Sequence, residues 1–205
     1  MRGKLKWLCV MALLLGGCGR TAINPATFSS YIGPVLRLQQ GTVGGGHPQG
    51  TGFLLRSSSG KKYLVTAGHV LKAPGKLLLF TYKGEQLDVV LGPVSIYERE
   101  DIAVIPVYNL NKNIKCFEVG EPPAIGQRVV SVGIPGKVGR PVYSEGIAQE
   151  SLLFSSCTVG RGMSGGPLLN SRGKVVGVIC GKLAGDREGS VNASIHSILP
   201  IINCK

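Results

Sequence analysis

The chain has 205 residues, of which 43% are hydrophobic and 17% are charged. This composition excludes an intrinsically disordered chain, and the length suffices for one well-cored domain or two small fused ones. The formal net charge of +12 comes without a dense basic run or a nucleic-acid-binding motif, so we expect an ordinary basic surface and no nucleic-acid partner.

The N-terminus predicts an export signal. Three basic side chains lie among the first six residues, and a short apolar segment follows at 8–15. That segment is too short to span a bilayer, which needs about 20 apolar residues. The sequence Leu-Gly-Gly-Cys at 15–18 resembles a bacterial lipobox, which implies a signal peptide over residues 1–17 and a lipid-modified Cys18. An ordinarily secreted protein is the alternative.

Lipidation would place the protein at a bacterial membrane, on the periplasmic or cell-surface side, because an acyl chain can hold a protein there without a spanning helix. Residues 18–30 begin at the modified cysteine and continue with small and polar residues. They predict a tether between the membrane and the folded domain.

Short apolar runs separated by glycine-rich and serine-rich turns fill residues 31–205 and favour β-structure. The first set of runs covers 35–39, 52–56, 63–66, 77–82, 87–91 and 102–107. A polar segment at 109–115 predicts a linker. The second set covers 127–132, 146–149, 152–156, 167–169, 174–179 and 190–195, followed by a short helix near 198–202. Two such sets predict an all-β domain of two small barrels, over residues 31–108 and 120–205.

Three short motifs contain the residue types that acyl transfer by serine requires. A Thr-Ala-Gly-His sequence ends at His69, Asp101 precedes the apolar run at 102–107, and Ser164 lies within Gly-Met-Ser-Gly-Gly-Pro. The reaction needs a base for the hydroxyl proton, an acid that orients the base, and amide donors for the oxyanion. The chain offers one candidate for each side-chain role, in the order His, Asp, Ser.

The three motifs resemble those of trypsin-like serine proteases of the chymotrypsin fold. The compact bacterial branch that includes the HtrA proteases is most similar, since it also shares Gly-Thr-Gly-Phe at 50–53, Gly-Gln-Arg-Val at 126–129 and Gly-Ile-Pro-Gly at 133–136. The resemblance runs from residue 34 to residue 202. It implies two six-stranded antiparallel β-barrels with a short C-terminal helix.

The same resemblance implies a serine endopeptidase. His69 would be the general base and acid, Asp101 would orient it, and Ser164 would be the nucleophile. The backbone N–H groups of Gly162 and Ser164 would form the oxyanion hole. A protein or peptide substrate would bind as an extended strand along a segment that comprises Cys180, Gly181 and Lys182.

Two departures from the animal trypsins affect what to expect. Met163 precedes the nucleophile where those enzymes have Asp, so the oxyanion hole must be ordered in another way. Thr158 stands where trypsin has an acid, and Ile179 stands where glutamyl endopeptidases have His. We expect Thr158, Asn192 and Ser194 to line the specificity pocket, which would suit a small, uncharged or polar side chain.

Four cysteines remain once Cys9 is lost with the signal peptide and Cys18 is lipidated. In an oxidising compartment an even number predicts two disulfides with three possible connectivities, and free thiols are the alternative. The resemblance to trypsins favours a Cys157–Cys180 bridge beside the pocket and a Cys116–Cys204 bridge from the linker to the C-terminus.

Two other interpretations compete with a trypsin-like enzyme. Gly-x-Ser-x-Gly also marks the nucleophile elbow of α/β-hydrolases, and Asp186 and His196 follow Ser164 in that order. An elbow needs a helix after the serine, whereas Pro167 and a hairpin follow here. A binding protein that keeps the fold without catalysis is the second alternative. Neither a cofactor nor a metal site is expected, because no His, Cys or Asp spacing fits one.

Overall fold

The structure is a computed structural model. It describes residues 31–40, 47–72, 75–111, 113–136, 139–149, 154–182 and 189–202. The predicted signal peptide, Cys18 and the tether lie outside these residues, as does Cys204. In the part of the chain that is described, no helix is both long and apolar enough to cross a membrane.

The first half of the chain forms one antiparallel sheet of seven strands in the order β4-β1-β2-β3-β7-β5, with β6 also paired to β7. The strands are β1 (Val35–Gln40), β2 (His47–Arg56), β3 (Lys62–Ala67), β4 (Leu77–Phe80), β5 (Val90–Leu91), β6 (Ser95–Tyr97) and β7 (Ile102–Tyr108). The sheet is a half-barrel, and its three-residue strand β6 is too short for the apolar pattern to reveal.

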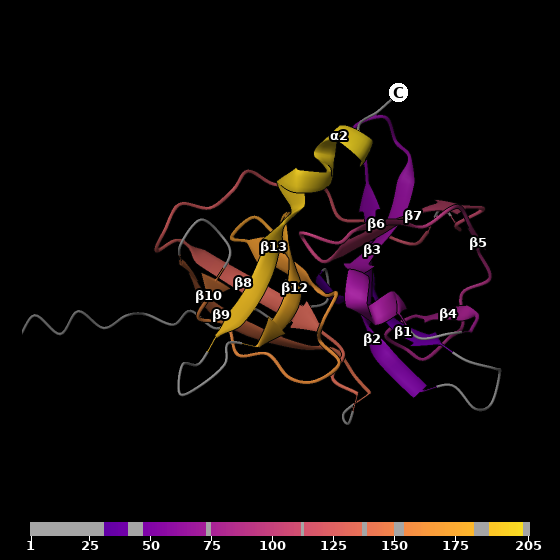
Figure 1. The fold of residues 1–205 in the computed structure, drawn as a ribbon, viewed down its shortest axis with the longest axis horizontal. Helices are drawn as coiled ribbons and strands as arrows, with labels where there is room; N and C mark the ends of the chain where they lie inside the picture. The colour runs from indigo at the N-terminus through magenta and orange to yellow at the C-terminus, as the bar shows by residue number, and fades with distance from the viewer. Residues whose placement is uncertain are drawn as a thin grey trace, which may run out of the picture.

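The second half forms a closed barrel in the order β10-β13-β12-β11-β8-β9. Its strands are β8 (Arg128–Gly133), β9 (Val142–Gln149), β10 (Phe154–Ser155), β11 (Pro167–Asn170), β12 (Val175–Lys182) and β13 (Ser190–Ser194). A 3-10 turn (Ile195–Ile198) and helix α2 (Leu199–Ile202) follow β13. The two sheets lie side by side, with α2 at the top of the view in Figure 1. The predicted all-β double-barrel fold with a short C-terminal helix is confirmed.

Strands of the first sheet are apolar on both faces because each face covers a different core. In β2, Leu54 packs inside the first sheet, whereas its neighbour Phe53 belongs to a cluster shared with the second barrel. In β3, Leu64 and Val65 divide in the same way. Successive side chains of a strand point to opposite faces, so β2 and β3 connect the two cores.

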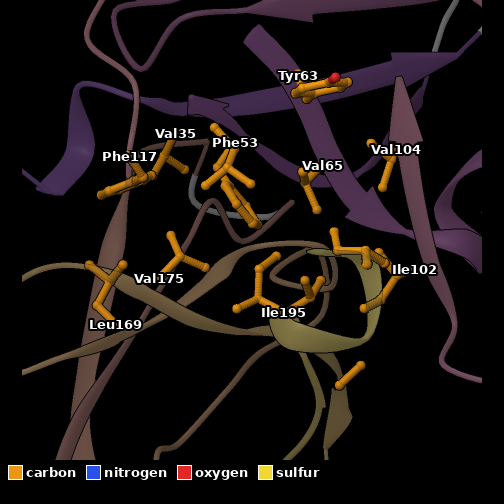
Figure 2. Close-up of a cluster of buried hydrophobic side chains, with 14 of the residues drawn as sticks. Val35, Phe53, Tyr63, Val65, Ile102, Val104, Phe117, Leu169, Val175 and Ile195 are labelled. Carbon is orange, nitrogen blue, oxygen red and sulfur yellow. The ribbon is translucent and has the colours of Figure 1, made fainter. Parts of the chain in front are cut away.

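The shared cluster holds the two sheets together (Figure 2). Phe53 and Val65 of the first sheet point toward Val175 of β12 and Ile195 of the 3-10 turn after β13. The rings of Phe53 and Phe117 meet edge to face, with their centroids 6.0 Å apart. Each fully buried side chain of this size contributes about 1.5–3 kcal/mol. This packing fixes the position of the carboxyl end of β3 relative to the loop before β11.

The connection between the sheets takes part in both of them. Leu110 is buried in the core of the first sheet. Phe117 forms a parallel bridge with Leu55, and Val119 forms one with Val175. The segment that the sequence predicts as a linker is therefore followed by residues that pair with a strand of each sheet and bridge the interface between them.

Candidate active site

His69 and Asp101 are held together where β3 ends and β7 begins. His69 lies in the 3-10 turn Gly68–Leu71 that follows β3 directly. Its ring Nδ1 is 2.6 Å from Asp101 Oδ2, and its backbone N–H donates to Asp101 Oδ1 over 2.8 Å. The N–H of Gly68 donates to the carbonyl of Asp101. With Nδ1–H directed at the carboxylate, Nε2 is the ring atom left to accept a proton.

Asp101 adopts an unusual backbone conformation that aims its carboxylate at the histidine. Its φ is +54°, in the left-handed region. Asp tolerates this region better than most residues, because its short side chain can hydrogen-bond locally. The pairing of Ala67 with Ile102 in the β3–β7 ladder brings the two strand ends to the same level.

Ser164 lies on the other side of the junction, in a tight loop before β11. The carbonyl of Ser164 accepts the N–H of Thr51 in β2 over 2.9 Å, and Gly165 N–H donates to Ile179 O in β12. Gly165 has φ +85°, and a Cβ there would overlap the Thr51 carbonyl and the Thr66 hydroxyl. Only glycine fits this conformation and this close approach.

Gly50 and Cys180 lie between the Ser164 loop and the segments that carry His69 and Asp101. A Cβ added to Gly50 would touch Val70, next to His69, and also the carbonyl of Ser164. The hydroxyl of Ser164 donates to the backbone carbonyl of Cys180 over 3.4 Å. The sulfur of Cys180 lies 3.9 Å from the carbonyl oxygen of Asp101. Among the described residues, no hydrogen bond joins the Ser164 hydroxyl to His69. Such bonds are often long before substrate binds.

Two backbone N–H groups at the nucleophile loop donate to no backbone carbonyl in the described part of the chain. The carbonyl of Arg161 accepts the N–H of Gly136 over 3.1 Å. In a planar trans peptide the following N–H, that of Gly162, points the opposite way. Within the described chain neither Gly162 nor Ser164 donates its N–H to a backbone carbonyl. These are the donors that an oxyanion hole requires.

Met163 fills the space beside the nucleophile with an apolar side chain. It is 2% exposed and packs against Val159 and Ile179. Its sulfur lies 3.2 Å from the N–H of Gly160, and its side chain covers Gly133 so closely that a Cβ there would lie 2.8 Å away. The loop is therefore supported here by packing rather than by a buried charge.

A depression of about 260 Å³ opens next to the nucleophile. Its lining comprises Val159, Gly160, Arg161, Ser164, Ile179, Gly181 and Lys182. Of the predicted substrate-binding residues, Gly181 and Lys182 line it, and the carbonyl of Cys180 faces the nucleophile.

The other three predicted pocket residues are not among the residues that line this depression. Asn192 is 2% exposed and hydrogen-bonds to Ser190. The Ser194 hydroxyl accepts the N–H of His196 at the start of the 3-10 turn. Thr158 is exposed and does not line the depression. Asn192 nevertheless pairs with Ile179, and Thr158 directly precedes Val159, so both are neighbours of residues that do line the depression.

The predicted Cys157–Cys180 disulfide is wrong, because both thiols are free. The Cys157 sulfur lies 3.7 Å from the carbonyl oxygen of Val129, inside the second barrel. The Cys180 sulfur lies 3.7 Å from the carbonyl oxygen of Glu100, in the first half of the chain. The two side chains therefore point into different environments. Burial, with the charge of Asp101 second, raises the pKa of Cys180 to about 12, so its thiol is neutral at physiological pH.

Cys116 is also a free thiol, and its proposed partner Cys204 lies outside the described residues. In the described part of the chain, no three His, Cys, Asp or Glu side chains gather closely enough to hold a metal ion.

Comparisons with known proteins agree with this geometry. The family model for the trypsin-like peptidase domain matches residues 50–178. The serine protease Do-like HtrB of Bacillus subtilis is 26% identical over 174 residues, covering 75% of this chain and 37% of that protein. The periplasmic serine endoprotease DegP of Escherichia coli is 28% identical over 205 residues, covering 82% and 42%. This chain thus spans about two fifths of the length of these curated relatives.

Solved structures show the same fold. The active form of the Rv3671c protease from M. tuberculosis superposes with a TM-score of 0.67 at 20% identity, covering 85% of this chain and 84% of that one. The MamO protease domain from Magnetospirillum magneticum gives a TM-score of 0.69 at 18% identity, covering 84% and 97%. Because the family model covers more than half of its residues, the chain belongs to the trypsin-like peptidase domain family, and within that family it is similar to the HtrA serine proteases.

Proposed function

We propose that the protein is a serine endopeptidase that hydrolyses peptide bonds through an acyl-enzyme on Ser164. The observation that carries the proposal is the double hydrogen bond between His69 and Asp101, which leaves Nε2 of the imidazole as a proton acceptor at the junction where Ser164 lies. Orienting the base in this way is the role of the acid in serine catalysis.

In the proposed reaction, His69 Nε2 takes the hydroxyl proton while Ser164 Oγ bonds to the scissile carbonyl carbon. The N–H groups of Gly162 and Ser164 bind the resulting oxyanion. Collapse of this intermediate breaks the C–N bond, and His69 gives its proton to the leaving amine. Water then repeats the sequence and breaks the ester, which restores the serine.

The Ser164 hydroxyl must turn from the Cys180 carbonyl to the histidine before it reacts. A change between staggered rotamers about its Cα–Cβ bond moves Oγ in this way without moving the backbone. The 3.4 Å bond to the Cys180 carbonyl is long and therefore weak, so it opposes this rotation little.

The substrate would be a protein or peptide bound as an extended strand. β12 pairs with β11 only up to Val178, so the edge beyond it, at Gly181 and Lys182, is available for an added strand beside the depression. Val159 and Ile179 give the depression apolar walls, which favours an uncharged side chain at the cleavage site.

We further propose that the chain is exported with a signal peptide at 1–17, a lipid on Cys18 and a tether up to residue 30, ahead of a peptidase domain at 31–205. Support comes from the lipobox-like sequence and from relatives that are named as periplasmic proteases. When the protein is expressed in a bacterium, we expect it in the membrane fraction, from which detergent should extract it. Mass spectrometry of its N-terminal peptide should show the added mass of a diacylglyceryl group on Cys18. Cys18→Ser should release it from that fraction, and a wild-type protein without the lipid mass would contradict lipidation.

A binding protein that keeps the fold without catalysis is the remaining alternative, and a fluorophosphonate probe separates the two functions. We expect the probe to label the folded wild-type protein at one site, the peptide that contains Ser164, and to leave Ser164→Ala unlabelled. Ser171→Ala, in the exposed turn between β11 and β12, is the matched control and should be labelled like the wild type. Folded wild-type protein that neither reacts with the probe nor cleaves casein would show the binding function instead.

A further inference from the structure

Thr51 in β2 joins the first sheet to both loops that surround the proposed oxyanion hole. The residue is fully buried, with 0% of its surface exposed. Its hydroxyl donates to the carbonyl of Gly162 over 2.7 Å and accepts the N–H of Ile134 over 2.9 Å. These two groups are 111 and 83 residues away along the chain.

The backbone of Thr51 adds two further bonds at the same place. Its N–H donates to the carbonyl of Ser164 over 2.9 Å. Its carbonyl accepts the buried hydroxyl of Thr66 in β3 over 2.7 Å. One residue of the first sheet therefore fixes the carbonyl groups on both sides of Met163, and so constrains the backbone between the two proposed oxyanion donors.

The loop needs such a support because its own sequence contains no charged side chain beside the nucleophile that could hold it by a buried ion pair. Met163 is apolar, and Gly162 has φ +94° in a chain region rich in glycine, so the backbone has other accessible conformations. Fixing the Gly162 carbonyl opposes rotation of the Gly162–Met163 peptide. Together with the bond from Gly136 to the Arg161 carbonyl, it fixes the peptide groups on both sides of Gly162 and so the direction of the Gly162 N–H.

We propose that Thr51 is a positioning residue that holds the oxyanion-hole loop in its catalytic conformation through its side-chain hydroxyl. The inference rests on the proposed peptidase function. A hydroxyl suits the position because it donates to one loop and accepts from the other at once. A methyl group in its place would leave the buried N–H of Ile134 and the partly buried carbonyl of Gly162 without this partner, which favours a rearranged loop.

The test compares Thr51→Val, which keeps the shape, with Thr51→Ser, which keeps the hydroxyl. Both are assayed on a quenched fluorescent peptide copied from a casein cleavage site, and against a peptidyl trifluoromethyl ketone of the same sequence. We expect Thr51→Val to lower kcat by about 10- to 100-fold, less than loss of a hole donor itself, with KM nearly unchanged. Inhibition by the ketone, whose adduct mimics the oxyanion, should weaken in parallel. Thr51→Ser should recover most of the loss.

Ser155→Ala is the control for stability. It removes a buried hydroxyl from a bond of the same 2.7 Å length, to Ser190 in the second barrel, and should leave kcat and the ketone affinity unchanged. Thermal melting of each variant shows the temperature below which it is fully folded, and kinetics are measured there.

Three outcomes would overturn the inference: a Thr51→Val enzyme with wild-type kcat, a loss that appears in KM and spares the ketone affinity, or a loss that Thr51→Ser does not repair. Failure of the proposed function looks different. The wild-type protein would then show no Ser164-dependent cleavage, whatever residue stands at position 51.

Discussion

Replacing Ser164 with Ala is expected to lower kcat for peptide hydrolysis about 10⁶-fold, and replacing His69 with Ala to lower it by a similar factor. Ser164→Ala leaves no oxygen to form the acyl-enzyme, and His69→Ala leaves no base for the serine proton. Because the two side chains act on the same proton, either loss disables the same step. The double variant should therefore be no slower than the single ones, apart from measurement error.

The measurement is hydrolysis of the quenched fluorescent peptide at neutral pH, with enzyme concentrations fixed by absorbance because the variants cannot be titrated at the active site. Ser171→Ala, remote from the junction, serves as the control and should keep wild-type rates. A Ser164→Ala enzyme that retained more than about 1% of wild-type kcat would contradict the proposed nucleophile. A double variant far slower than both single variants would show that the two residues act in separate steps.

Replacing Asp101 with Asn is expected to lower kcat about 10⁴-fold at neutral pH, with little loss of stability. The Asn oxygen can still accept the backbone N–H of His69, as Asp101 Oδ1 does over 2.8 Å. The amide nitrogen would face ring Nδ1, however, and donate to it. That arrangement puts the ring proton on Nε2, so the imidazole can no longer accept the proton of Ser164.

Glu100→Gln is the matched control, because it removes a carboxylate from the adjacent residue without touching the histidine bonds. It should keep kcat near the wild-type value, and both variants should show wild-type circular dichroism and similar melting temperatures. An Asp101→Asn enzyme within about tenfold of wild type would show that another group orients His69.

The proposed side-chain roles could be predicted from sequence because each is carried by a local motif. His69 follows a strand, Asp101 precedes one, and Ser164 is surrounded by glycines that permit a tight loop. Each of these motifs is a short continuous segment, so it can be recognised without knowledge of the fold. The fold only has to bring the three segments together. The all-β architecture was predictable for a similar reason, because short apolar runs between glycine-rich and serine-rich turns mark individual strands.

What the sequence could not provide depends on contacts between distant residues. The bond from the Thr51 hydroxyl to the Gly162 carbonyl joins residues 111 positions apart and leaves no periodic signal. The burial of Asn192, whose side chain is 2% exposed, depends on the packing of β13 against its neighbours, which a count of residues along the chain does not give. The disulfide prediction failed because the sequence shows only that Cys157 precedes the Ser164 loop and that Cys180 lies in the neighbouring strand. It does not show in which direction each sulfur points.

The apolar cluster between the sheets also decides when the chemistry becomes available. The proposed base and its acid belong to the first half of the chain, the proposed nucleophile belongs to the second, and Phe53 and Ile195 belong to the apolar cluster between them. A chain in which only one sheet has formed would hold only part of the proposed catalytic set. Under the proposed function, peptide hydrolysis therefore requires both sheets to have docked, because neither sheet alone contains both the base and the nucleophile.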